Sequence, residues 1–364
     1  MKRIRVVVVD DSPTSRQVLV AILRADHEIE VVGQAADGLE AVEMVKRLHP
    51  DIVTMDVQMP KLDGFAATKR IMVEAPTPIL ITTSVDPHVL SVSLEAVRMG
   101  ALAVHAKPGA PTAPAFDEEA RELVRQVKAM SYVKVVRHYE PSPAQAPLTQ
   151  MQTLAAAALH KIPAEVVAIA ASTGGPGALH RILTTLPADY PVPILVVQHI
   201  SRGFIPGFAG WLDKASRLRV KPAQEGEALR PGTVYVAVDD HHLCVTPLRR
   251  IHLSTAQAVG GFRPSGTVLF ESVAAAFGSR AVAVILTGMG RDGVDGLRAV
   301  RKAGGRTVAE SEATAVVYGM PAAAVGAGLA DFILPLDQVC AAVAGLRLSV
   351  RPPVVRGLRK VGTR

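Results

Sequence analysis

Short apolar runs of strand length alternate with amphipathic helical patterns along most of this 364-residue chain, and this alternation limits the fold more than any other feature. A regular succession of strand and helix favours a parallel sheet with helices on both faces. Few aromatic residues (4%) and many Val, Ala, Leu and Ile suit strands that are buried on both sides. The succession occurs twice, so we predict an α/β protein with two doubly wound parallel sheets.

The first series covers residues 4–108. Its strand candidates are residues 4–9, 30–34, 52–55, 79–82 and 103–106. Helical patterns lie around residues 15–25, 38–48, 64–73 and 89–98, and a last helix is expected over residues 115–131. We therefore assign the first domain to residues 1–130.

The second series starts near Ile162. Its strand candidates are residues 166–171, 194–198, 234–237, 281–287, 307–309 and 332–334. Two further runs, residues 243–246 and 250–253, predict a β-hairpin inserted in this series. We assign the second domain to residues 162–348.

The parts of the chain outside the two series have a biased composition. Residues 141–147 are rich in Pro, Ala and Gln, which is typical of a linker, and we assign the linker to residues 131–161. The net charge is +7, but six basic residues and no acid lie from Arg347 onward, so the rest of the chain is close to neutral. We interpret residues 349–364 as a solvated basic tail. No basic stripe with interleaved aromatics and no basic helix-turn-helix pattern occurs, so nucleic-acid binding is not expected.

The apolar runs and the cysteines predict where the protein works. The run that follows the basic first residues covers only residues 6–9, which is too short for a signal peptide. Longer runs, such as residues 166–171, are far short of a membrane span. Cys244 and Cys340 show no metal or redox spacing and are predicted to be reduced. We expect a cytoplasmic protein without membrane insertion, and a monomer.

Three carboxylates are predicted to meet at one edge of the first sheet. Asp10 and Asp11 follow its first strand, and Asp56 follows its third. The carboxyl ends of neighbouring parallel strands line one crevice, and Mg²⁺ would offset the repulsion between these carboxylates. Thr83 and Lys107, after the fourth and fifth strands, add a hydroxyl and an ammonium. Helix capping would explain a single Asp at a strand end, but the five positions together predict an aspartyl-phosphate site.

The motifs around these residues resemble the response-regulator receiver family over residues 4–108. They are Val9-Asp10-Asp11-Ser12, Met55-Asp56-Val57-Gln58-Met59-Pro60, Leu62-Asp63-Gly64 and Lys107-Pro108. The resemblance implies a flavodoxin-like fold and phosphorylation of Asp56 by a sensor histidine kinase. It also implies that Asp11, Asp56 and the backbone carbonyl of Gln58 hold Mg²⁺, while Asp10 supports the waters of the metal. Thr83 would be the switch hydroxyl, and Lys107 would contact the phosphoryl group.

A hydroxyl, an imidazole and a carboxylate follow three strands of the second series. Ser172 follows residues 166–171, His199 follows residues 194–198, and Asp292 follows residues 281–287 through a tight turn. These strand ends share one edge of the predicted sheet, which is the arrangement of a Ser–His–Asp triad whatever the chain order. His199 would take the proton of Ser172, and Asp292 would orient the imidazole.

Other interpretations of these residues are open. Ser172 opens a glycine-containing turn into a helix, where a Ser is most often an N-cap. The same turn could face an anion, although it lacks the Gly-Lys-Ser/Thr ending of a phosphate loop and the dinucleotide fingerprint. His241 and His242 are rival histidines, which we place in a polar turn before the hairpin as a surface or substrate-loop site.

The second series resembles the chemotaxis protein-glutamate methylesterases across about residues 163–345. The motifs, in order, are Val167-Ala168-Ile169-Ala170-Ala171-Ser172-Thr173-Gly174-Gly175-Pro176, Val197-Gln198-His199, Arg263-Pro264-Ser265, Leu286-Thr287-Gly288-Met289-Gly290-Arg291-Asp292-Gly293, Glu312-Ala313-Thr314 and Tyr318-Gly319-Met320-Pro321. The resemblance implies a Rossmann-like catalytic domain that needs no cofactor and hydrolyses glutamate γ-methyl esters on chemoreceptor helices. It also implies deamidation of certain glutamines there.

The same resemblance implies roles for individual residues. Ser172 would be the nucleophile, His199 the base and Asp292 the residue that orients the base. Thr173 and Met289 would shape the oxyanion site. Two alternatives stay open: the same chemistry in a non-flagellar receptor pathway, and a regulator whose second domain binds a nucleotide or a partner without chemistry.

Overall fold

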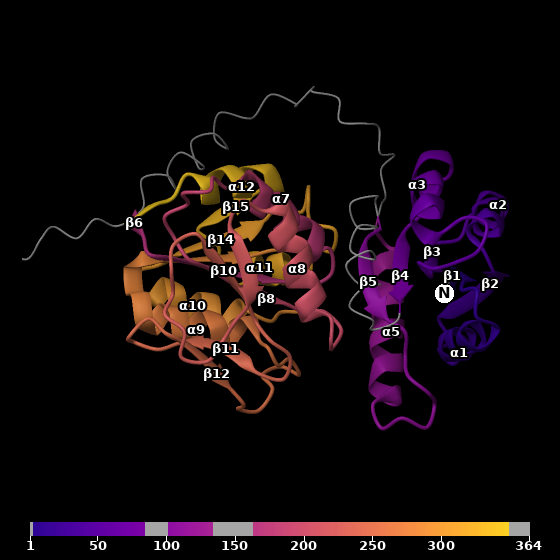
Figure 1. Ribbon diagram of the computed structural model, residues 1–364, viewed down its shortest axis with the longest axis horizontal. Coiled ribbons are helices and arrows are strands. Elements are labelled where there is room, and N and C mark those ends of the chain that lie inside the picture. Colours follow the sequence, from indigo (N-terminus) through magenta and orange to yellow (C-terminus); the bar gives the residue numbers. More distant parts are fainter. Residues whose placement is uncertain (1–2, 84–100, 134–162, 349–364) are drawn as a thin grey trace, which may run out of the picture.

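The computed structural model describes residues 3–83, 101–133 and 163–348, and it contains two parallel sheets with helices on both faces (Figure 1). The predicted α/β class with two doubly wound sheets is confirmed. The helix predicted around residues 89–98, most of the predicted linker and the basic tail lie outside the described residues. The domain boundaries at residues 130, 161 and 348 stay predictions.

The first sheet has the strand order β2-β1-β3-β4-β5 in the part of the chain that the structure describes, and each neighbouring pair is parallel. The strands are β1 Ile4–Val9, β2 Ile29–Ala35, β3 Ile52–Met55, β4 Ile79–Thr83 and β5 Ala103–Ala106. The helices are α1 Pro13–Arg24, α2 Gly38–Leu48, α3 Gly64–Glu74 and α5 Phe116–Ser131.

The two faces of this sheet are covered by different helices. Buried residues of α1 and α5 pack with one set of strand side chains, and those of α2 and α3 pack with the other set. From β1 the chain goes outward to β2 and then crosses to β3 on the other side of β1. The carboxyl ends of β1 and β3 therefore form the topological switch point, where open α/β sheets bind ligands.

The second sheet has the order β15-β14-β13-β7-β8-β10-β9 among the described residues, again with parallel neighbours. The strands are β7 Val166–Ala171, β8 Ile194–Gln198, β9 Arg219–Pro222, β10 Thr233–Val236, β13 Ala281–Ile285, β14 Arg306–Glu310 and β15 Phe332–Leu334. The helices are α7 Gly175–Thr185, α8 Ile205–Ala215, α9 Gly266–Phe277, α10 Val294–Lys302, α11 Met320–Gly326 and α12 Leu336–Ala344. The short elements are β6 Pro163–Ala164, η1 Gly278–Arg280 and β16 Arg347–Leu348.

The switch point of the second sheet lies between β7 and β13. Strands β8 to β10 continue from β7 on one side, and β13 to β15 lie on the other. Helices α7, α8 and α12 pack on one face, and α9, α10 and α11 pack on the other. The crevice at the carboxyl ends of β7 and β13 is thus the expected ligand position.

The predicted β-hairpin is present between β10 and β13. Strands β11 His242–Val245 and β12 Ile251–Ser254 pair antiparallel as a two-stranded sheet of their own, and β11 contacts α9. Strand β13 ends at Ile285, two residues earlier than predicted; the N–H of Leu286 still donates to the carbonyl of Ala170, whereas that of Thr287 donates to the side chain of Glu310.

The described residues contain no helix that is both long and apolar enough to cross a membrane. Cys244 and Cys340 are both free thiols.

Candidate active site and phosphorylation site

Ser172 and His199 lie on adjacent strands at the carboxyl edge of the second sheet. Strands β7 and β8 pair so that Ala171 is opposite Gln198, and each candidate residue is the next one along its strand. The N–H of His199 donates to the carbonyl of Ala171 over 2.9 Å. The two main chains are therefore fixed relative to each other where the hydroxyl and the imidazole begin.

His199 and Asp292 contact each other directly. The Nε2 atom of His199 lies 2.9 Å from Oδ2 of Asp292, and the two side chains are only 11% and 3% exposed. The other ring nitrogen, Nδ1, is buried and has no hydrogen-bond partner within the described ranges. Asp292 therefore occupies one nitrogen of the imidazole and leaves Nδ1 available to a hydroxyl.

The carboxylate of Asp292 is held by the first turn of α9. Ser265 Oγ donates to Oδ1 over 2.6 Å, the N–H of Gly266 donates to Oδ2 over 2.6 Å, and the N–H of Thr267 donates to Oδ1 over 3.2 Å. A helix N-terminus also favours a negative charge. Burial raises the pKa of Asp292, but the hydrogen bonds from His199, Ser265 and Gly266 outweigh burial and lower the pKa to about 2.

The peptide between Ser172 and Thr173 has a fixed orientation. The carbonyl of Ser172 accepts hydrogen bonds of 2.8 Å from Gln198 Nε2 and of 2.8 Å from the N–H of Gly175. Because the carbonyl and the N–H of a trans peptide point in opposite directions, the N–H of Thr173 points away from Gln198.

The peptide between Gly288 and Met289 is fixed in the same way. The carbonyl of Gly288 accepts N–H groups from Gly319 (3.1 Å) and Met320 (2.8 Å), so the N–H of Met289 points away from the start of α11. A Cβ on Gly288 would lie 2.7 Å from Cβ of Ser172, so this close approach requires glycine. Two oriented N–H groups thus belong to the loops beside Ser172.

Sequence reasoning missed two supports of this site. It quoted Gln198 and Ser265 inside motifs but gave them no role. Ser265 is the N-cap of α9, a signal that was readable from a Ser before an apolar helix. Nothing in the sequence shows that Gln198 would reach back to Ser172.

The prediction that His242 lies at the surface was wrong. His242 is the first residue of β11 and is fully buried. Its Nε2 lies 3.0 Å from the carbonyl of Gln257, and its Nδ1 accepts the N–H of Ser265 over 3.2 Å. Because both ring nitrogens are occupied, His242 is not a free base. His241 is half-buried, with Nδ1 2.9 Å from the carbonyl of Asp239.

Asp10, Asp11 and Asp56 meet at the switch point of the first sheet. One carboxylate oxygen of each lies within 4.8 Å of the others. The caps of α1, α2 and α3 are instead Ser12, Asp37 and Asp63, so helix capping does not explain the three carboxylates. Gly64 permits the close approach of α3, since a Cβ there would lie 2.0 Å from the carbonyl of Asp56.

Lys107 joins this cluster. Its Nζ lies 2.8 Å from Oδ2 of Asp10 and 2.8 Å from Oδ2 of Asp56. The N–H of Lys107 donates to the carbonyl of Thr83 over 2.8 Å, which ties the ends of β4 and β5 together. Gln58, two residues after Asp56, is exposed.

The charges of this cluster affect one another. Burial raises the pKa of Asp56 and Lys107 acts against it, while the charge of Asp10 raises the pKa further. Burial lowers the pKa of Lys107, but the carboxylates of Asp10 and Asp56 outweigh burial and raise the pKa overall. A positive charge added at this site would therefore relieve the carboxylates.

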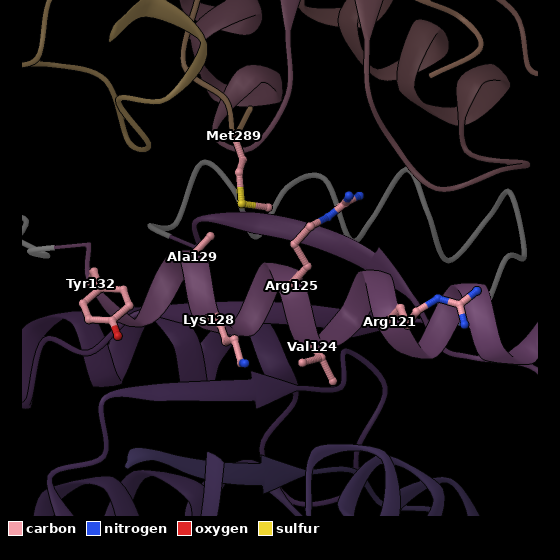
Figure 2. A pocket seen from close by; sticks show the side chains of 7 residues that line it. All are labelled: Arg121, Val124, Arg125, Lys128, Ala129, Tyr132 and Met289. Carbon is pink, nitrogen blue, oxygen red and sulfur yellow. The ribbon is translucent and has the colours of Figure 1, made fainter. Parts of the chain in front are cut away.

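The first domain contacts the rim of the second at several points. Met289, residues of α5 such as Arg125, and Tyr132 at the end of that helix line a shared cavity of about 450 Å³ (Figure 2). Val316 packs against the apolar cluster that contains Val127 of α5, and a Cβ on Gly174 would lie 2.6 Å from Val316. Helix α5 thus lies next to the loops that flank Ser172.

Comparison with known proteins agrees with this arrangement. Residues 167–343 match the CheB methylesterase family, and residues 6–113 match the response regulator receiver domain. The chain is 54% identical over 338 residues to protein-glutamate methylesterase/protein-glutamine glutaminase 3 of Anaeromyxobacter dehalogenans, covering 92% of this chain and 97% of that protein. It is 50% identical over 336 residues to protein-glutamate methylesterase/protein-glutamine glutaminase 4 of Myxococcus xanthus, covering 92% of this chain and 95% of that protein. It is 44% identical over 351 residues to protein-glutamate methylesterase/protein-glutamine glutaminase 1 of Syntrophus aciditrophicus, covering 96% of this chain and 100% of that protein. The chain therefore belongs to the protein-glutamate methylesterase/protein-glutamine glutaminase family, with a receiver domain before a CheB methylesterase domain.

Proposed function

We propose that this protein is a phosphorylation-activated serine hydrolase that demethylates glutamate methyl esters, and deamidates glutamines, on the cytoplasmic helices of chemoreceptors. The observation that carries the proposal is the paired His199 and Asp292 beside Ser172, in a chain of this family. The alternative of a second domain without chemistry does not account for this pairing. The same chemistry would serve chemoreceptors of a flagellar pathway or of a non-flagellar one.

The reaction is acyl transfer through Ser172. Nδ1 of His199 takes the proton of the hydroxyl as Ser172 Oγ attacks the ester carbonyl, and Asp292 stabilises the imidazolium. The imidazolium then gives this proton to the leaving methoxide, which departs as methanol. In the second half of the reaction His199 takes a proton from water, the water attacks the acyl-enzyme, and glutamate is released as Ser172 regains its proton. With a glutamine side chain, the same steps release ammonia. The oriented N–H groups of Thr173 and Met289 are the donors for the oxyanion.

Methanol release from a methylated receptor tests these roles. Ser172→Ala and His199→Ala are expected to remove nearly all activity, and Asp292→Ala somewhat less, because nucleophile and base act as a unit. Ser279→Ala, in η1 at the amino-terminal edge of the sheet, is the matched control and should retain activity. Ester hydrolysis at the wild-type rate in Ser172→Ala would overturn the assignment.

The receiver half takes a phosphoryl group on Asp56 from a sensor histidine kinase. The three carboxylates are hard oxygen donors, so the cluster fits Mg²⁺. Asp11, Asp56 and the carbonyl of Gln58 would hold the ion, and Asp10 would hold its waters. The ion supplies positive charge to the phosphoryl oxygens, and Lys107 contacts them. Thr83 is the switch hydroxyl. A small phosphodonor with Mg²⁺ should add one phosphoryl mass to the wild type and none to Asp56→Asn.

The receiver restrains the hydrolase by covering it. Met289 and Val316 lie against α5, and the N–H of Ala106, which precedes Lys107, donates to Oγ of Ser201 over 3.1 Å. Ala106 directly precedes Lys107, which contacts Asp56, and Ser201 is two residues after His199, so this hydrogen bond joins the segments that carry the two sites. We place the protein in the cytoplasm, where its receptor helices are, and take it to be a monomer.

A further inference from the structure

An aromatic ring covers one face of the proposed base. Phe262 stacks on the imidazole of His199, with 4.1 Å between ring centroids and 4° between the ring planes. None of the roles assigned above involves Phe262. Its contact with the base is therefore an additional feature of the site.

The position of Phe262 is set by a tight turn. The N–H of Val259 donates to the carbonyl of Phe262 over 3.1 Å, and the N–H of Phe262 donates to the carbonyl of Val259 over 3.0 Å. The two central residues, Gly260 and Gly261, have φ of 61° and 87°, which glycine adopts without strain. The chain reverses sharply here and presents Phe262 to the site.

The same segment also reaches the carboxylate. Ser265 and Gly266, three and four residues after Phe262, donate the two shortest hydrogen bonds to Asp292. Residues 259–267 therefore contact both the imidazole and its carboxylate partner, and they fix the geometry of the pair.

A stacked ring restrains the imidazole plane of His199, which the hydrogen bond to Asp292 alone does not do. The hydrogen bond at Nε2 fixes one edge of the ring but does not by itself hold the tilt of the imidazole plane, which varies with the χ1 and χ2 torsions of His199. A flat neighbour at 4.1 Å removes that freedom. An aromatic face also attracts a cation, and the imidazole becomes cationic only as it takes the proton. The contact is thus stronger in the transition state than in the resting enzyme.

We propose that Phe262 is a positioning residue of the hydrolase: its ring holds the imidazole plane of His199 so that Nδ1 faces Ser172, and its face stabilises the imidazolium. The proposal rests on the proposed function of Ser172 and His199.

The test uses the full-length protein with phosphodonor and Mg²⁺, and it measures kcat and KM for methanol release. Phe262→Leu should lower kcat about tenfold and leave KM within about twofold, because the lost contact is made in the transition state. Phe262→Tyr keeps the ring and should stay within about threefold of the wild-type kcat. Leu248→Ala is the matched control: this apolar residue lies in the turn between β11 and β12, is 82% exposed, and should keep the wild-type kcat when truncated.

A spectroscopic measurement on the wild type tests the stacking without any Phe262 variant. In the wild type, the ring protons of His199, assigned by their loss in His199→Gln, should resonate upfield because of the ring current of Phe262. The shift should persist in Phe262→Tyr and vanish in Phe262→Leu.

Four results would overturn the proposal: no upfield shift in the wild type, a wild-type kcat in Phe262→Leu, equal losses in the Leu and Tyr variants, or an effect confined to KM. Ser172→Ala, measured in parallel, distinguishes a failure of the proposed function from a failure of the role of Phe262. Activity that survives in Ser172→Ala removes the proposed function itself, whereas an inactive Ser172→Ala beside a fully active Phe262→Leu removes only the role of Phe262.

Discussion

Ser265 donates its hydroxyl to Oδ1 of Asp292 over 2.6 Å, while its own N–H donates to Nδ1 of His242 over 3.2 Å. The buried His242 is in turn held by the carbonyl of Gln257. A chain of contacts therefore runs from the hairpin strand β11 through Ser265 to the proposed catalytic carboxylate. The hairpin therefore helps to position Asp292, because its first residue, His242, holds Ser265.

Removing the Ser265 hydroxyl should weaken catalysis more than substrate binding. In Ser265→Ala, Asp292 keeps its contacts with His199 and Gly266 but loses one of its shortest hydrogen bonds. We expect kcat to fall about tenfold and KM to change little, since a hydrogen bond to a charged group contributes roughly 1.5–3 kcal/mol. Ser254→Ala, at the end of β12, is the control. Equal kinetics of Ser265→Ala and the wild type would show that the backbone donors alone hold Asp292.

The depressed pKa of Asp292 predicts a dependence of stability on acid pH. Its pKa is about 2 in the folded protein, against an ordinary value of 3.8. The stabilisation is therefore complete above pH 3.8 and is lost as the pH falls towards 2, an effect of about 2 kcal/mol. Chemical unfolding at pH 5 and at pH 3 measures the part of this loss that occurs above pH 3. Asp292→Asn should lose less free energy of unfolding between these two values than the wild type, and an identical loss would contradict the assignment.

His105 predicts a second pH dependence, in the first domain. It is buried on β5, neither ring nitrogen has a hydrogen-bond partner in the described segments, and burial lowers its pKa to about 4. The unfolded chain binds this proton below pH 6.5 and the folded chain does not, so stability should fall as the pH drops from 6.5 to 4. His105→Leu should flatten that part of the profile, measured as the unfolding midpoint against pH. A wild-type slope in the variant would mean that other groups cause it.

The sequence predicts best those strands whose residues form a short apolar run between polar or turn residues. Strands β1, β3, β5, β7, β8 and β15 have the predicted bounds. Edge strand β9 escaped prediction because Val220 is its only buried residue, between Arg219 and Lys221. A short edge strand with one apolar side chain has no period to detect.

Parts of the site were predictable for a similar reason. Ser172, His199 and Asp292 follow strands of one parallel sheet, and topology brings such strand ends together. The contacts of Phe262, Ser265 and His242 depend on how a turn and a hairpin fold over that edge. Nothing in the local sequence indicates that His242 would find two partners in the interior, so a polar residue beside a turn was assigned to the surface.

The contacts of α5 with Met289 and Val316, and of Ala106 with Ser201, place the receiver against the proposed active site. Such contacts within one chain are modest in size, so one added charge can shift the balance between covered and open states. A change of about 1.4 kcal/mol shifts this balance roughly tenfold.

The proposal that the receiver covers the active site until it is phosphorylated is tested most directly by the rate of methanol release from a methylated receptor. This rate is measured for the full-length protein and for a fragment of residues 162–348, each with and without phosphodonor and Mg²⁺. The unphosphorylated full-length enzyme should be the slowest. Phosphodonor should speed only the full-length protein, and Asp56→Asn should abolish that gain. Equal rates in all four conditions would contradict this regulation and leave only an esterase joined to a receiver by a linker.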